Sequence, residues 1–276
     1  MDHPLRSARI EAALERALAG APSELLALLD RSSGLPGPRP NLDLARSAGA
    51  AIARGGARSA GVIAALCASQ GDYHPIVAAQ ALAARHLAGD RGAGGALQEL
   101  AGDSRQVVRA GVVEALRTVL AARGDAAVVE LSAWTDGYLQ AHVALEAISE
   151  RAVLTQLGAA EEVVARLAEA FDLADRSPRA AERSQGVRQL RQGLPAQIAA
   201  VAARFPAALT WLEARTATSR PESREVIAGA IAALRRGAFP TAQTDRLAAA
   251  LAASAPPDRD AARVVHGTRK RSKGRR

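Results

Sequence analysis

Clustered basic residues near the C-terminus are the strongest chemical signal in this sequence. Seven of its 36 Lys and Arg residues lie between Arg263 and Arg276, where there is no acidic residue. Such a cluster neutralises phosphates and releases their counterions, which gives affinity without sequence preference. We therefore predict contact with nucleic acid or another anionic surface; the alternative is a solubilising terminus without a fixed partner. The predicted contact residues are Arg269, Lys270, Arg271, Lys273, Arg275 and Arg276.

A second basic group lies upstream, in a segment for which we predict a helix over residues 178–192. Four of its arginines recur at helical steps, which places them on one helix face with a fifth beside them. A basic helix face in a groove would bind phosphate oxygens. The alternative is a solvated face whose charges pair with acids on neighbouring helices, such as Asp172, Asp175 or Glu213. The arginines are Arg176, Arg179, Arg183, Arg191 and, beside them, Arg188.

Aromatic side chains make up only 3% of the chain, so their positions are informative. Trp134, Tyr138 and Trp211 together would form a surface that contacts bases or a peptide. The alternative is that they fill the core at the ends of helices. Asp136 follows Trp134 by two residues and is a candidate carboxylate, although this turn position also suits an Asp that caps the next helix.

Other chemistry finds little support in the residues. A single cysteine, Cys67, excludes a multi-cysteine metal site, and the five histidines show no metal-ligand spacing. The motifs of phosphate-binding loops and of nucleophile elbows are not present. His142 and Glu146 lie four residues apart, and we interpret them as a surface contact rather than an acid–base pair. We therefore expect no metal and no cofactor, and we favour a non-enzymatic protein.

Helical periodicity runs through the chain, and no strand pattern interrupts it. The spacing of apolar residues predicts short helices joined by short turns, including separate helices over residues 178–192 and 195–204. A ten-residue stretch from Ser32 to Asn41 carries three prolines and two glycines, which excludes a helix there. This pattern is typical of stacked pairs of antiparallel helices.

A sequence motif recurs along the chain at nearly constant spacing. Its copies begin at Asp72, Asp103 and Asp136, and a degenerate copy begins at Pro221. In each copy we expect a turn residue to cap a helix whose apolar face ends on Ala-Leu or Ala-Ile. One helix pair cannot bury its own apolar face, so neighbouring pairs must stack. The predicted fold is all-α, an α-solenoid of stacked antiparallel helix pairs without β-sheet.

The copy that begins at Asp103 resembles the second helix of a HEAT repeat, whose loose pattern is an Asp, a Val-Arg pair and a closing Ala-Leu. The resemblance extends over residues 42–253 and implies a HEAT/ARM-like array, whose usual role is that of a protein–protein adaptor. The pair is Val108-Arg109 in this copy, and Val77-Ala78, Ala141-His142 and Ile227-Ala228 in the others.

The chain is also similar in kind to the bacterial alkylpurine DNA glycosylases, which are built from HEAT-like repeats. That family holds DNA in a basic concave groove lined by Trp and a functional Asp. Trp134, Asp136 and Trp211, with the arginine-rich segment between them, carry the similarity. Here the Trp and the Asp are two residues apart, whereas the family has about one helical turn between them. The resemblance implies that Asp136 would be the carboxylate to test.

Four regions follow from these patterns: an N-terminal helical pair (1–31), a Pro/Gly-rich loop (32–41), the repeat array (42–253) and a disordered basic tail (254–276). The charged N-terminus lacks the apolar region of a signal peptide, and no apolar run is long enough to span a membrane, so we expect a cytoplasmic protein. The preferred function is a scaffold that binds a macromolecule, with DNA or RNA favoured. The alternatives are a protein–protein adaptor and a helical-repeat DNA-base glycosylase.

Overall fold

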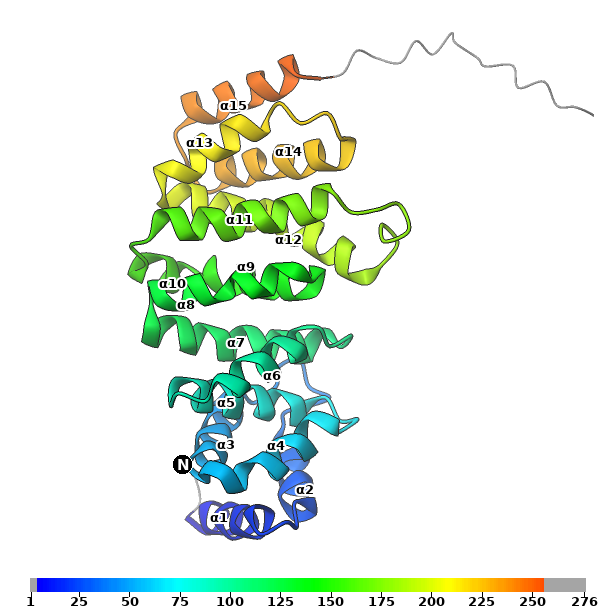
Figure 1. Ribbon diagram of the computed structural model, residues 1–276, viewed down its shortest axis with the longest axis vertical. Helices are drawn as coiled ribbons and strands as arrows, with labels where there is room; N and C mark the ends of the chain where they lie inside the picture. Colours follow the sequence, from blue (N-terminus) through cyan, green and yellow to red (C-terminus); the bar gives the residue numbers. More distant parts are fainter. Residues whose placement is uncertain (1–3, 256–276) are drawn as a thin grey trace, which may run out of the picture.

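The computed structural model describes the backbone of residues 4–255 and the side chains of residues 9–255. These residues form fifteen α-helices and two short 3-10 helices, without a strand. Figure 1 shows the helices stacked along the long axis of the molecule, from α1 (Pro4–Leu18) at one end to α15 (Thr241–Ala253) at the other. The predicted all-α solenoid is confirmed. No helix in this part of the chain is long and apolar enough to cross a bilayer.

The helices form two layers. One layer, which we call the front layer, contains six helices, each packed beside the next. The other, the back layer, covers one face of it, while α1 and α2 pack at the N-terminal end against α4 and α5. The front layer consists of α3 (Leu42–Arg54), α5 (Tyr73–Leu87), α7 (Gln106–Arg123), α9 (Tyr138–Ile148), α12 (Gln185–Arg204) and α14 (Pro221–Arg236). The remaining elements are α2 (Ser23–Ser32), η1 (Gly56–Arg58), α4 (Ser59–Ala68), α6 (Arg91–Ala101), α8 (Asp125–Glu130), η2 (Leu131–Asp136), α10 (Arg151–Gln156), α11 (Ala160–Asp175) and α13 (Pro206–Arg215).

The front-layer helices run parallel, and hydrogen bonds tie their N-terminal ends together along one edge. The Tyr73 hydroxyl donates to the carbonyl of Asn41 at 2.7 Å, and Gln185 Nε2 donates to the carbonyl of Ser104 at 3.2 Å. Between these two contacts, Arg105 Nη1 donates to the carbonyls of residues 69–71 at 3.2–3.4 Å. Since the helices start level with one another, side chains at equal distances from the N-termini line up across the layer.

Small residues let the first helices of the front layer approach closely. A Cβ on Gly49 of α3 would lie 2.6 Å from the Cβ of Gln80, and a Cβ on Gly111 of α7 would lie 2.7 Å from Ile76 Cγ2. Both positions therefore require glycine for backbone approach rather than for a special dihedral angle. Between these neighbours, every residue of α5 from Tyr73 to Ala83 is buried.

One hydrophobic core runs through the whole array. Its buried residues form a single cluster that begins at Ala13 in α1 and ends at Leu251 in α15. Fully burying one Leu or Ile side chain contributes about 1.5–3 kcal/mol. Because the core is continuous, each helix pair depends on its neighbours, as expected of stacked repeats.

The structure corrects two predicted helices. Residues 177–184 are not helical, with turns over 179–183, and α12 is one helix over Gln185–Arg204 rather than two helices over 178–192 and 195–204. Ser177 precedes Pro178, which disfavours helical backbone there, and the Ser184 side chain caps the helix by accepting from Val187 N at 3.3 Å. Pro195 lies inside α12, where buried Leu190, Leu194 and Ile198 hold the helix against the core.

The repeat aspartates do not cap the front-layer helices as expected. The N-cap residues of α5, α7 and α9 are Asp72, Arg105 and Gly137, and none makes a side-chain cap hydrogen bond. Asp103 instead accepts from the backbone N–H of Arg105 at 2.8 Å and from its guanidinium. This ion pair lowers the pKa of the Asp103 carboxyl. The aspartate therefore shapes the turn before the helix rather than its first turn.

Candidate functional site

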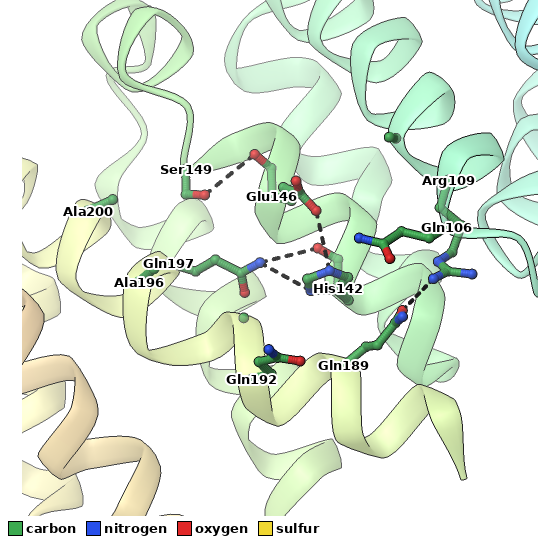
Figure 2. Close-up of a pocket in the computed structure, with 12 residues that line it drawn as sticks. Gln106, Arg109, His142, Glu146, Ser149, Gln189, Gln192, Ala196, Gln197 and Ala200 are labelled. Atoms are coloured by element: carbon green, nitrogen blue, oxygen red, sulfur yellow. Dashed lines mark hydrogen bonds and ion pairs between the residues drawn. The ribbon is translucent and has the colours of Figure 1, made fainter. Parts of the chain in front are cut away.

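A groove of about 620 Å³ crosses the front layer at α7, α9 and α12 (Figure 2). Four glutamines, an arginine, a histidine and a glutamate line it, which gives several polar groups that converge on one space. Convergent polar groups in a concave space are the usual mark of a binding site. From α7 come Gln106, Arg109 and Ala110; from α9 and its C-cap, His142, Glu146 and Ser149; from α12, Gln189, Gln192, Gly193, Ala196, Gln197 and Ala200.

Arg109 and His142 occupy the same position of the repeat motif, the second residue of the Val108-Arg109 and Ala141-His142 pairs. Because α7 and α9 run parallel, this position brings both side chains to the same groove. In α5 and α14 the position is occupied by Ala78 and Ala228. The polar groove therefore coincides with the two copies that depart from alanine there.

Arg109 is a charged residue that is almost completely buried, with 3% of its surface exposed. Its Nη1 donates to the carbonyl of Asp103 at 2.5 Å, and its Nη2 donates to Gln189 Oε1 at 2.6 Å. No carboxylate of the described residues lies within 4.0 Å of its guanidinium. Burial lowers the pKa of Arg109, and the charges of Asp103 and Glu146 oppose this. In the part of the chain that the structure describes, only neutral oxygens thus accept hydrogen bonds from this buried positive charge.

His142 connects the α9 side of the groove to α12. Its Nε2 lies 3.3 Å from Glu146 Oε2, while Gln197 Nε2 lies 3.4 Å from both the Nδ1 and the carbonyl oxygen of His142. Burial lowers the pKa of His142, Glu146 raises it, and Arg109 lowers it. A neutral imidazole fits these contacts, because its Nε2–H can donate to Glu146 while Nδ1 accepts from Gln197. The predicted contact between His142 and Glu146 thus forms, but inside a groove.

Gln197 leaves one hydrogen-bonding atom unused. The residue is 4% exposed, its Nε2 faces His142, and its Oε1 is buried with no hydrogen-bond partner among residues 9–255 (Figure 2). A buried acceptor without a donor costs about 1–3 kcal/mol. One acceptor in the wall of the groove is therefore left without a donor from the described residues.

Gly193 makes room for the histidine ring. A Cβ at this position would lie 2.6 Å from both Cε1 and Nδ1 of His142. With glycine, the backbone of α12 passes directly over the imidazole and holds it between two helices. Any larger residue at 193 would displace the ring from its place in the groove.

The arginine-rich segment does not form one helix face, so that prediction is wrong. Arg176 is the C-cap of α11, Arg179 and Arg183 lie in the turns over 179–183, and only Arg188 and Arg191 belong to α12. None of them lines the groove.

Two of these arginines are paired with acids close in sequence. Arg176 binds Asp172 at 3.2 Å, and Arg191 binds Glu182 at 3.4 Å. Arg191 also donates to the Ser177 hydroxyl at 2.8 Å, while Glu182 accepts a second guanidinium, that of Arg220, at 3.3 Å. The segment is therefore partly neutralised. Arg179, Arg183 and Arg188 remain exposed at the edge where the front-layer helices begin.

The aromatic residues do not form a common surface. Trp134 is 6% exposed in the back-layer core and borders a smaller cavity of about 170 Å³ that also includes His86. Trp211 packs edge-on against Phe171, with ring centroids 5.5 Å apart, and the Arg215 guanidinium lies 5.6 Å from its ring. Both tryptophans thus fill space between helices, which is the alternative that the sequence left open.

Three further candidates lie outside the groove. Tyr138, at the start of α9, is half-buried. Asp136 is exposed at the end of η2, and neither residue lines the groove. The predicted tail contacts lie outside the described residues: Arg269, Lys270, Arg271, Lys273, Arg275 and Arg276.

Comparisons of the chain with protein-family models, with curated proteins and with solved structures find no match. The site therefore stands on its own geometry. Sequence reasoning missed Arg109 and the four glutamines as site residues. The available signal was the repeat position at which Arg109 and His142 replace alanine.

Proposed function

We propose that this chain is a non-enzymatic binding scaffold of the HEAT type, and that its groove binds an extended segment of another polypeptide. The observation that carries the proposal is the set of carboxamides along the groove. A carboxamide both donates and accepts hydrogen bonds, as a peptide group does. Such side chains suit the main chain of a bound segment and place little demand on its sequence. The carboxamides belong to Gln106, Gln189, Gln192 and Gln197.

The length of the groove sets the length of the segment. Gln189 and Gln197 are eight residues apart on α12, which corresponds to about 12 Å along a helix axis. An extended chain advances about 3.3 Å per residue. The groove between these glutamines thus accommodates about four residues of an extended chain. A single amino acid is too short to reach from one glutamine to the other.

The charges of the groove favour a polypeptide over nucleic acid. Its lining carries the positive charge of Arg109 and the negative charge of Glu146. Nucleic acid binding relies on several basic side chains that neutralise neighbouring phosphates. The arginines at 176–191 do not supply them, because they lie at the helix edge and are partly paired with acids.

Nucleic acid remains the second candidate partner because of the seven basic residues between Arg263 and Arg276. This role predicts binding to duplex or single-stranded nucleic acid that weakens steeply with salt and is lost when residues 263–276 are deleted. Binding that is absent at low salt, or that does not respond to salt, contradicts it. No observation favours a glycosylase, because Asp136 lies outside the groove and Trp134 is buried in the core.

Selection of random displayed peptides on the immobilised full chain tests the polypeptide proposal. We expect enriched peptides whose affinity falls in Gln192→Ala, since Gln192 lines the groove. The matched control is Gln243→Ala, which removes an exposed glutamine of α15 and should not change binding. Absence of enriched peptides, or equal binding by both variants, contradicts the proposal.

A further inference from the structure

The geometry points to a polypeptide segment that carries a carboxylate, held by Arg109, as the ligand of this groove. The inference rests on the proposed function and names the chemistry of the ligand. It depends on two groups in the groove wall, the Arg109 guanidinium and the Gln197 carboxamide oxygen. Among the described residues, Arg109 has no carboxylate partner and the Gln197 oxygen has no donor.

The first group is the buried guanidinium. Charged groups that are buried are ordinarily paired with an opposite charge, because desolvation of an unpaired ion is costly. Arg109 has two neutral acceptors, the Asp103 carbonyl and Gln189 Oε1, for a group with five N–H donors. Since Arg109 also lines the groove, an anion bound there would complete its coordination.

The second group is Gln197 Oε1, which is buried without a donor. A main-chain N–H of a bound segment is the donor that a polypeptide offers at every residue except proline. Glu146 provides a further acceptor beside His142. The groove thus offers donors near Arg109 and acceptors near Gln197, so the two ends of the ligand must differ.

The spacing of these two groups sets the distance between the carboxylate and the N–H of the ligand that would meet them. Arg109 contacts Gln189, and Gln197 lies about 12 Å further along α12. The carboxylate and the N–H that meets Gln197 are therefore separated by about three or four extended residues. A free amino acid or a small carboxylic acid would satisfy only one of the two groups.

A carboxylate fits this groove better than a phosphate. The lining offers one guanidinium, and the carboxylate of Glu146 lies in the same space. A phosphate group carries about −1.5 to −2 charge at neutral pH and would be repelled more strongly by Glu146. A carboxylate carries one negative charge and matches the planar fork of a single Arg.

The carboxylate could belong to an Asp or Glu side chain or to a C-terminus, and the experiment separates these sources. The probes are fluorescent five-residue peptide pools with one fixed residue: Glu, Gln or phosphoserine, each with a free or an amidated C-terminus. Polarisation measures binding to the full chain. A charge-assisted hydrogen bond to Arg109 predicts that carboxylate pools bind at least about tenfold more tightly than their carboxamide counterparts. The source is an acidic side chain if amidated Glu pools retain the preference, and a C-terminus if only free termini do.

Substitutions then assign the preference to Arg109. In Arg109→Gln, carboxylate and carboxamide pools should bind equally. In Gln197→Leu, all pools should bind more weakly while the preference for carboxylate remains. Glu146→Gln leaves the bonds of Arg109 in place and should raise the affinity for carboxylate pools by about two- to fivefold. Circular dichroism shows whether Arg109→Gln folds. If it does not fold, Glu146→Gln still tests the inference.

The outcomes distinguish this inference from the proposed function. Equal binding of the amidated Glu and Gln pools to the wild type, with no gain from a free C-terminus and with binding still sensitive to Gln192→Ala, overturns the carboxylate inference and leaves the peptide groove intact. Tighter binding of phosphoserine pools also overturns it. Binding by no pool overturns both proposals.

Discussion

The front-layer helices α5 and α9 hold equivalent places in the array, yet their surfaces differ. In α5 every residue from Tyr73 to Ala83 is buried, and the closely packed Gly49 and Gly111 flank it. In α9 the ring of His142 reaches the groove, and Glu146 is partly exposed within it. The same architecture thus produces a fully buried helix segment at one repeat and a polar groove at another.

The difference comes from a few side chains rather than from the fold. The position held by Ala78 in α5 is held by His142 in α9, and Gly193 of α12 gives the larger ring its room. A stacked array repeats its backbone, so any repeat can acquire a site through such substitutions. The comparison predicts that α5 is sensitive to changes in packing and α9 to changes in charge.

The largest expected effect lies in the closed region. Ile76→Ala removes a fully buried side chain of α5 that contacts α7, and it should lower the free energy of unfolding by about 2–5 kcal/mol. Val129→Ala, at an exposed apolar residue, should change it by less than about 0.5 kcal/mol. Denaturant titration measures both. Similar values for the two variants would contradict the closed packing of α5.

Close approach of α5 and α7 predicts a smaller effect. Gly111→Ala places a Cβ 2.7 Å from Ile76 Cγ2 and should cost about 1–3 kcal/mol. Gly95→Ala, in α6 where a Cβ meets nothing within 4 Å, should instead stabilise the protein by about 0.5–1 kcal/mol. The cost of Gly111→Ala should also shrink when Ile76→Ala is present, because Cγ1 and Cγ2, the two atoms nearest to the new Cβ, are then gone. Additive costs would show that the helices relax apart.

Much of the fold was predictable from the sequence because it depends on local patterns. Apolar spacing predicts the helices, and the copies at Asp72, Asp103 and Asp136 predict the stacking. The predicted start of the helix over 178–192 was wrong because apolar spacing does not determine where a helix begins. The helix begins later because Ser184 caps α12, and Ser177 lies before Pro178, which disfavours helical backbone there.

The groove was not predicted because its members are distant in sequence. Arg109 and Gln189 form a hydrogen bond across 80 residues, and Gln197 reaches His142 across 55. Polar residues on a helix look solvated until the neighbouring helices are placed. Only the parallel stacking of α7, α9 and α12 shows that these side chains face one another.

Weaker binding is expected when the link between α7 and α12 is removed. Gln189→Ala takes away the side chain that accepts from Arg109 Nη2, so the guanidinium loses its fixed orientation. We expect carboxylate-containing peptides to bind about threefold to tenfold more weakly, a loss of one ordinary hydrogen bond. Fluorescence polarisation measures this against the Gln243→Ala control. An unchanged affinity would mean that Arg109 does not need Gln189 for its position.

The smallest expected effect is a pH dependence that originates in α9. Burial lowers the pKa of His142 below its ordinary value of 6.5 in the folded state, whereas the unfolded chain keeps that value. As the pH falls below about 6.5, the unfolded state therefore takes up a proton that the folded state resists, and stability decreases. Thermal midpoints at about pH 7.5 and about pH 5.5 span this range around the ordinary histidine pKa. His142→Gln should show a smaller decrease between them than the wild type, since a glutamine does not titrate. Equal decreases in the two proteins would show that the polar groove of α9 does not set this pH response.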